Sequence, residues 1–232
     1  MRNNQFPSAL LLKIKENEMG NFNIYNKMIM IPAILFAFAF HEFAHALCAD
    51  RLGDKTPRYE GRLTLDPMKH IDIVGFIMII LVGFGWAKPV NTNPSAYKNY
   101  YRDDFLVNIA GPIANFVLSI IATFVLAIYS VTLYNYIPID AANVLYDMIQ
   151  SVVTLNVMLG FFNLLPVPGF DGYHILQDIF KDKFYKFENA IGNYRILIML
   201  AAVYFAGYII LPPSRIVIGY LNTLCYYIMM LF

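Results

Sequence analysis

The sequence predicts an all-α polytopic membrane protein, with about five transmembrane helices, one re-entrant or half-spanning segment and a short β-hairpin at the membrane edge. Of the 232 residues, 59% are hydrophobic and only 14% are charged, whereas a soluble domain is about a quarter charged. The mean hydropathy is +0.53, and several apolar runs approach the ~20 residues that a helix needs to cross a bilayer. Because backbone polar groups must bond internally in lipid, these runs are expected to be helices.

The first elements are a polar tail and one long span. Residues 1–27 lack the long apolar core of a signal peptide, and Met19 offers an alternative start just upstream of the first apolar run. The first span covers residues 28–49 and stops at the charge and glycine of Arg51 and Gly53.

A less regular region follows the first span. Residues 61–66 alternate polar and apolar side chains, which predicts a short strand. The apolar run 71–86 is short for a full span and closes in a glycine-rich turn, so we expect it to dip into the membrane and return.

The remaining spans divide the chain into three parts. Spans are expected at residues 105–134, 143–165, 191–211 and 216–232, with polar or proline-containing breaks between them. The parts are the tail 1–27, a core 28–185 and a C-terminal transmembrane hairpin 186–232. A net charge of +1 gives no basic excess, so no nucleic-acid partner is expected.

A metal-binding pattern lies inside the first span. His41 and His45 are four residues apart, so on a helix both imidazoles share one face and can reach one metal ion, with Glu42 beside them to polarise a water molecule. Ionisable groups deep in a membrane are costly and are functional by default. The pattern therefore predicts one metal ion per chain, zinc by preference, because zinc commonly takes three protein ligands and leaves a position open.

The third ligand is expected in the sequence NLLPVPGFDG, residues 163–172. Prolines there break the helix and let a carboxylate turn inward, so Asp171 is our choice. The alternative is that Asp171 caps a helix over residues 172–180. His174 and His70 are the fallback ligands.

Topology offers a check on this ligand set. If residues 71–86 crossed the membrane fully, Asp171 would emerge on the face opposite His45. With a re-entrant segment, the loops on the His45 side carry eleven of the Lys and Arg residues and the loop 135–142 carries none. The excess of positive charge predicts that the metal lies towards the cytoplasmic face of the cell membrane.

Three motifs in this order resemble the site-2 protease family of intramembrane metalloproteases. They are HEFAH at residues 41–45, GPIAN at residues 111–115 and NLLPVPGFDG at residues 163–172. The resemblance covers most of residues 28–185, and without a PDZ-like or CBS-like domain the chain resembles a minimal member.

The resemblance implies roles for the motif residues. It implies that His41, His45 and Asp171 bind Zn²⁺, that Glu42 is the general base and acid, and that Asn163 is catalytic and holds the substrate or the oxyanion. Asn115 and Gly85 are expected to contact the substrate, Gly85 through a membrane-edge hairpin that pairs with an unwound substrate helix. The implied partner is a transmembrane protein or peptide, cleaved in regulated intramembrane proteolysis, and the oligomeric state is left open.

Two other functions use similar residues. A prenyl-protein processing peptidase also places glutamate and histidine in spanning helices, but the proline-rich approach to Asp171 argues against it. A metal transporter or sensor would use the same ligands without peptide hydrolysis, and it should carry further ionisable residues at matched depth in several spans, which are sparse here.

Overall fold

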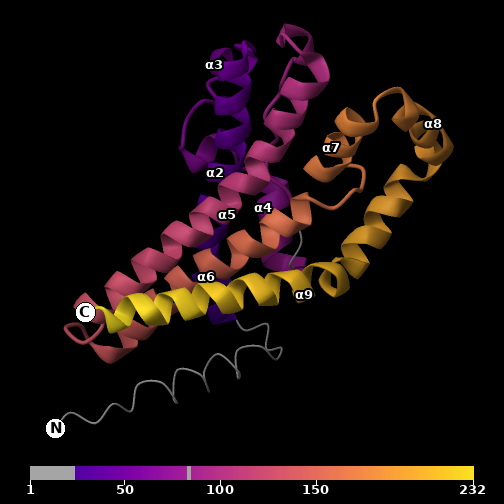
Figure 1. Ribbon diagram of the computed structural model, residues 1–232. Coiled ribbons are helices and arrows are strands. Elements are labelled where there is room, and N and C mark those ends of the chain that lie inside the picture. The colour runs from indigo at the N-terminus through magenta and orange to yellow at the C-terminus, as the bar shows by residue number, and fades with distance from the viewer. Residues whose placement is uncertain (1–23, 83–84) are drawn as a thin grey trace.

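Long helices form the body of the protein, as the sequence predicts. The computed structural model describes residues 24–82 and 85–232 (Figure 1), so most of the predicted tail 1–27, Met19 included, lies outside the described residues. Within them, four helical stretches are long and apolar enough to cross a membrane. Three of them lie in α2 (Ile24–Leu52), α5 (Tyr100–Thr132) and α6 (Ile139–Asn163), and the fourth includes α9 (Arg195–Met230).

Helices α2, α5 and α6 all pack against one another (Figure 1). Ala33, Ala37 and Ala46 of α2 are fully buried, and such small residues let helices approach closely in a membrane. Ile113, Ile120 and other large apolar residues of α5 are exposed. An exposed apolar face on a long helix is what contact with lipid requires, so α5 is built to meet protein on one side and lipid on the other.

The C-terminal region differs from the predicted pair of spans, because residues 195–230 form the single helix α9. Pro212 and Pro213 lie inside it, and α9 changes direction along its length (Figure 1). Proline removes a backbone donor and bends a helix without necessarily ending it, so the proline pair that suggested a loop produces a bend. The predicted number of five spans is therefore not confirmed.

The region between α2 and α5 contains short helices. They are α3 (Thr56–Tyr59), η1 (Pro67–Lys69), α4 (Ile73–Val82) and η2 (Pro94–Ala96). With 10 residues, α4 is about 15 Å long, half of a bilayer core of about 30 Å, as expected for a half-spanning segment. Residues 83–84 of the predicted glycine-rich turn lie outside the described residues.

The predicted β-hairpin is not confirmed. Residues 61–66 form no strand, and Gly61 has a φ of +67°, which belongs to turns. The described residues contain one isolated antiparallel bridge, between Ile71 and Ala87. The chain therefore pairs where it enters and leaves α4, later in the sequence than the predicted strand.

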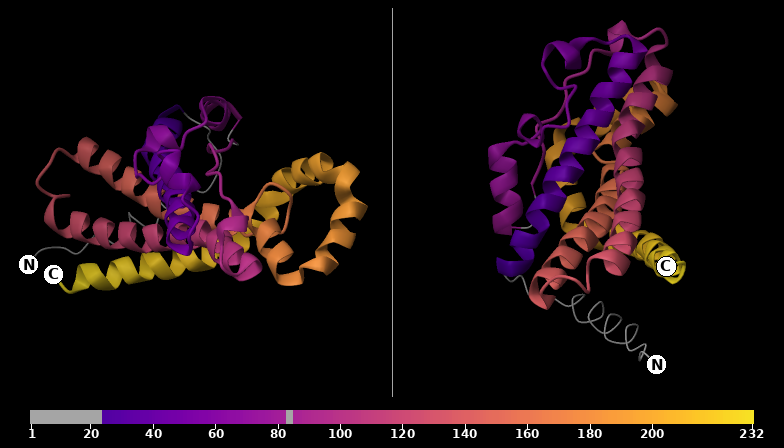
Figure 2. Two further views of the ribbon diagram at one scale, coloured as in Figure 1. Left: turned by 90° about the horizontal axis from the view of Figure 1, so that it is seen from above. Right: turned by 90° about the vertical axis from the view of Figure 1, so that its left-hand side faces the viewer.

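After α6 the chain turns back towards α5. The prolines of residues 164–170 follow the end of α6, and α7 (Asp171–Phe180) packs against α5. Next come α8 (Asp182–Ile191) and η3 (Gly192–Tyr194), which lead into α9. Figure 2 shows α7, α8 and the start of α9 as an arch on one side of the molecule.

Candidate metal centre

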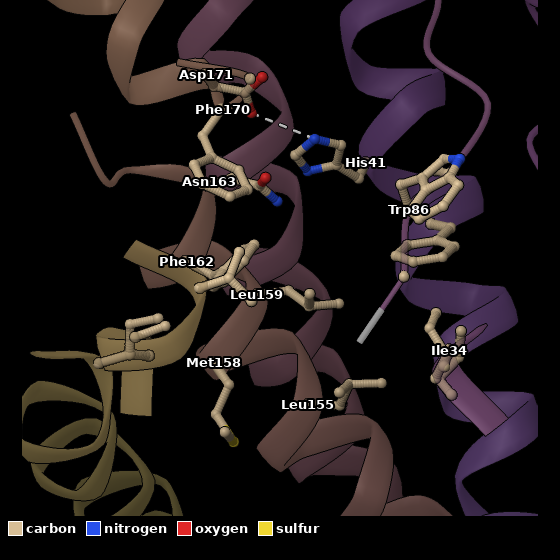
Figure 3. Close-up of a pocket in the computed structure, with 18 of the residues that line it drawn as sticks. Ile34, His41, Trp86, Leu155, Met158, Leu159, Phe162, Asn163, Phe170 and Asp171 are labelled. Atoms are coloured by element: carbon tan, nitrogen blue, oxygen red, sulfur yellow. Dashed lines mark ion pairs between the residues drawn. The ribbon is translucent and has the colours of Figure 1, made fainter. Parts of the chain in front are cut away.

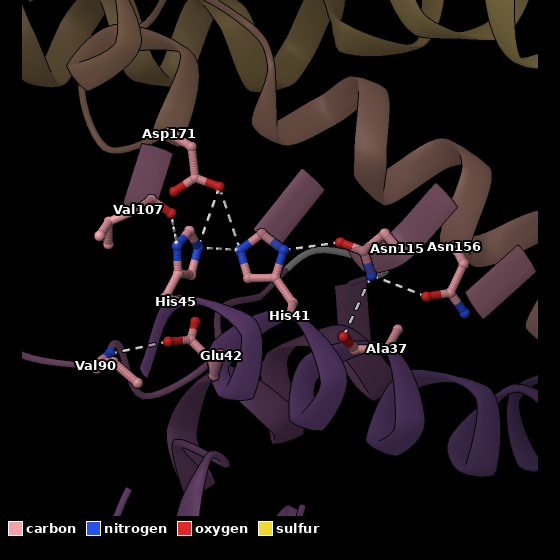
Figure 4. Close-up of polar contacts among 9 residues, drawn as sticks. All are labelled: Ala37, His41, Glu42, His45, Val90, Val107, Asn115, Asn156 and Asp171. Carbon is pink, nitrogen blue, oxygen red and sulfur yellow. Dashed lines mark hydrogen bonds and ion pairs between the residues drawn. The ribbon is translucent and has the colours of Figure 1, made fainter. Parts of the chain in front are cut away.

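Two histidines of α2 and one aspartate of α7 bring three donor atoms together. His41 and His45 lie one turn apart, with 3.1 Å between their Nε2 atoms. Asp171 Oδ2 lies 3.3 Å from His41 Nε2 and 3.4 Å from His45 Nε2 (Figure 4). Two ligands at 2.0–2.1 Å from a tetrahedral zinc ion are about 3.3 Å apart, so the spacing of these atoms suits zinc.

The protonation of the imidazoles also suits a cation. His45 Nδ1 lies 2.7 Å from the carbonyl oxygen of Val107, which can only accept, so Nδ1 donates, and in the neutral ring that binds a metal Nε2 keeps its lone pair. The buried Asp171 Oδ2 has no hydrogen-bond partner. A buried oxygen without a donor is costly, and a cation among the three donor atoms would remove that cost.

The fold brings Asp171 to the histidines from a distant part of the sequence. Asp171 is the first residue of α7, and no side chain caps this helix, so the carboxylate is not used as the alternative cap. Both α7 and His45 pack against α5. Asp171 and His45 therefore lie at the same membrane face, which requires that α4 does not cross the membrane fully.

The fallback ligands lie elsewhere. Among the described residues, the only group of three or more candidate ligands that converge is His41, His45 and Asp171. His70 is fully buried, its Nε2 donates to Thr64 O at 2.7 Å, and burial lowers its pKa. His174 is exposed on α7.

Glu42 lies beside the two histidines and is held by the chain that follows α4. The carboxylate is 7% exposed, and its Oε2 accepts a hydrogen bond of 2.9 Å from the backbone N–H of Val90 (Figure 4). A backbone donor fixes one oxygen of the carboxylate, so the other is the one free to handle protons. The Val90 contact could not be predicted from the sequence, because it uses a backbone N–H, which every residue except proline has.

Arg62 fixes the extended segment that carries Val90. Its guanidinium donates to the carbonyl oxygens of Lys69 and Lys88, one on each arm of the chain around α4. Lys88 N–H also donates to His70 O at 2.9 Å. Arg62 is only 5% exposed, so it joins the two arms from inside the protein.

A cavity of about 560 Å³ opens from the metal ligands along the helices (Figure 3). His41, Glu42, Asp171 and the predicted residues Asn163 and Gly85 all line it. Its other walls are mostly apolar and come from four parts of the chain: Ile34 and Phe38 of α2, Trp86 and Pro89 after α4, Leu155, Met158 and Phe162 of α6, and Val203, Ala206 and Ile210 of α9.

Asn115 lies behind His41, away from this lining. Its side chain is fully buried, and its Oδ1 is 2.7 Å from His41 Nδ1. In the structure Asn115 thus contacts a histidine, whereas the sequence predicted that it contacts the substrate.

Gly111 is a site residue whose function the sequence left unexplained. A Cβ atom at this position of α5 would lie 2.3 Å from His45 Nε2 and 2.6 Å from His41 Cε1. Glycine is therefore needed for α5 to pass directly beside the donor atoms.

Comparison with known proteins agrees with this arrangement. The family model described as Peptidase family M50 matches residues 29–144 and 131–206. The candidate zinc metalloprotease YwhC of Bacillus subtilis is 39% identical over 165 residues, which are 69% of this chain and 74% of YwhC.

A second relative is more distant, and solved structures add no further comparison. The candidate zinc metalloprotease Rip2 of Mycolicibacterium smegmatis is 32% identical over 158 residues, 65% of this chain and 56% of Rip2. The chain thus spans little more than half of Rip2. No solved structure matches significantly. Since the family model covers well over half of the sequence, the chain belongs to peptidase family M50, the site-2 protease family that its motifs resemble.

Proposed function

We propose that the protein is an intramembrane zinc metalloprotease that hydrolyses peptide bonds in or near transmembrane segments of other proteins. The observation that carries this proposal is the convergence of His41, His45, Asp171 and Glu42 at one end of an apolar cavity between long apolar helices. The names of the relatives YwhC and Rip2 support zinc and proteolysis.

Zinc would be held, one ion per chain, by His41 Nε2, His45 Nε2 and Asp171 Oδ2. A zinc ion in such a site supplies a Lewis acid that makes water nucleophilic near neutral pH. The ligands come from two helices, so Asp171 also fixes the start of α7 against α2.

Glu42 is assigned the proton transfers. Val90 N–H holds Oε2, and the other oxygen, Oε1, takes a proton from the attacking water and gives it to the amine that leaves.

Asn163 and Gly85 are assigned contacts with the substrate. Asn163 lines the cavity at the end of α6 (Figure 3), where its amide could donate to the oxygen that gains charge as the peptide bond is attacked. Gly85 lines the cavity next to Trp86, and its backbone is assigned the pairing with an extended peptide; the side where a Cβ would stand is packed against Gly75 of α4.

The cavity favours an apolar substrate segment. Its walls combine Leu, Met, Ile and Phe side chains with few polar groups, which suits a transmembrane segment better than a soluble peptide. The expected surroundings are the lipid bilayer, and cleavage would serve regulated intramembrane proteolysis. The excess of Lys and Arg in the loops on the His45 side supports an active site towards the cytoplasm.

The decisive experiment measures zinc content and cleavage in detergent for the wild type, Glu42→Gln and Asp171→Asn. The substrate is a designed transmembrane peptide with a fluorophore and a quencher. We expect the wild type to cleave with about one zinc per chain, Glu42→Gln to keep zinc and lose cleavage, and Asp171→Asn to lose zinc.

The transporter or sensor alternative has a distinct outcome. If wild type and Glu42→Gln bind zinc equally, cleave nothing and move zinc across liposome membranes at similar rates, the protease proposal fails. Thr123→Val is the matched control, because Thr123 is a buried polar residue of α5 whose hydroxyl donates to Ser119 O within the same helix.

A further inference from the structure

A row of buried amides runs from His41 to helix α6. Asn115 of α5 lies between His41 and Asn156 of α6, and both asparagines are fully buried. Asn115 Oδ1 is 2.7 Å from His41 Nδ1, and Asn115 Nδ2 is 2.8 Å from Asn156 Oδ1 (Figure 4). Three helices are thus joined by side-chain amides behind one metal ligand.

Two backbone carbonyls fix the direction of these hydrogen bonds. Ala37 O lies 3.3 Å from Asn115 Nδ2, and Val152 O lies 2.8 Å from Asn156 Nδ2. A carbonyl oxygen only accepts, so each of these contacts requires an NH₂ group. If the amide of Asn115 turned over, its oxygen would face Ala37 O with no proton between them.

The consequence reaches the metal ligand. With both NH₂ groups committed, Asn156 turns its Oδ1 to Asn115, and Asn115 turns its Oδ1 to His41. That oxygen can only accept, so His41 Nδ1 carries the proton. The other nitrogen, Nε2, then keeps its lone pair and faces Asp171 and His45.

We propose that Asn156 is a positioning residue, which acts through Asn115 to hold His41 in the tautomer and orientation that bind zinc. The inference rests on the proposed zinc site. Polar side chains in membrane helices commonly join helices to one another. The hydrogen bonds of Asn156 do more than join helices, because their donor and acceptor order determines which nitrogen of His41 carries the proton.

The first test compares zinc affinities. Chelator competition on the full chain in detergent would give the zinc Kd of wild type, Asn115→Leu, Asn115→Asp and Asn156→Leu. Loss of an outer partner of a ligating histidine weakens metal binding about 10–100-fold, so we expect about 10–100-fold for Asn115→Leu and about tenfold for Asn156→Leu. Asn115→Asp keeps an acceptor oxygen for His41 Nδ1 and should bind zinc more tightly than Asn115→Leu.

The control is again Thr123→Val, which removes a buried hydroxyl of α5 outside the row. Thermal unfolding of the metal-free proteins reports general damage to packing. A folded Asn156→Leu protein whose zinc Kd stays within twofold of the control would overturn the proposal. If the wild type bound no zinc, or if His41→Ala left zinc binding intact, the proposed zinc site itself would be wrong.

The second test examines the intact row in the wild type. In metal-free wild type labelled with ¹⁵N-histidine, the His41 signals, assigned by their loss in His41→Asn, report which nitrogen carries a proton. We expect a proton on Nδ1 at pH 8. A His41 whose Nδ1 lacks a proton would overturn the proposal, whatever the variants do to folding.

Discussion

Replacing Gly111 by alanine should weaken zinc binding strongly, although no zinc ligand is substituted. The added Cβ would stand 2.3 Å from His45 Nε2, 2.6 Å from His41 Cε1 and 2.7 Å from His45 Cε1. Atoms this close must separate to at least 3.0 Å. Either the imidazoles or helix α5 must therefore move.

The size of the movement sets the size of the effect. The distance between the new Cβ and His45 Nε2 must increase by at least 0.7 Å, from 2.3 Å to 3.0 Å, whereas metal–ligand distances tolerate about 0.2 Å. His45 cannot swing away freely, because its Nδ1 is bonded to Val107 O on the same helix as Gly111. We expect zinc affinity to fall by about 100-fold or more, comparable to the upper range for disturbing a ligand's support.

The assay is chelator competition, followed by zinc analysis of the purified protein. Gly219→Ala of α9 is the matched control, since an added Cβ there meets nothing within 4 Å. It should bind zinc like the wild type. A Gly111→Ala protein that keeps one zinc per chain with unchanged affinity would refute the geometry described for the site.

Three further substitutions test separate parts of the protein. Asn163→Leu should lower kcat about 10²–10³-fold and leave zinc content unchanged, as expected for loss of an oxyanion donor. An equally large loss of affinity for a peptide that binds without being cleaved would contradict this role. Arg62→Met should lower kcat about tenfold with zinc retained, since 1 Å of displacement near Glu42 can cost up to about 10²-fold; Arg62→Lys should not rescue it, because one ammonium cannot hold two carbonyls in a fixed plane. Burial, and next the Asp104 carboxylate, raise the pKa of Asp178 to about 7. The folded state then holds this proton more tightly than the unfolded state, so stability falls as the pH rises from about 4 to 7. Asp178→Asn should remove that loss and raise Tm by a few degrees at pH 8 but not at pH 4, and an unchanged Tm at pH 8 would contradict the buried position.

Local patterns predicted the ligands well. The spacing of His41 and His45 fixes their common face on any helix, and the proline-rich approach to Asp171 indicated a carboxylate that turns inward. The requirement that α4 not cross the membrane followed from this ligand set. The convergence of His41, His45 and Asp171 in the structure agrees with the two motif inferences, each of which uses residues close together in the sequence.

Features that depend on contacts between distant segments could not be predicted. The need for a glycine at position 111 arises only because α5 passes beside two rings of α2. The contact between Val90 and Glu42 uses a backbone N–H, which cannot be read from the residue type. Asn156 could not be distinguished in the sequence from asparagines that only join membrane helices. Pro212 and Pro213 predict a break between two spans, yet α9 runs through both prolines, with buried Ile210 before them and buried Leu221 after them.

The most direct test of the zinc site is X-ray diffraction from crystals of the zinc-loaded protein, recorded on both sides of the zinc absorption edge. We predict one anomalous peak per chain, about 2.0–2.2 Å from His41 Nε2, His45 Nε2 and Asp171 Oδ2. A peak at His70 or His174, or a zinc ion bound without Asp171, would contradict the account.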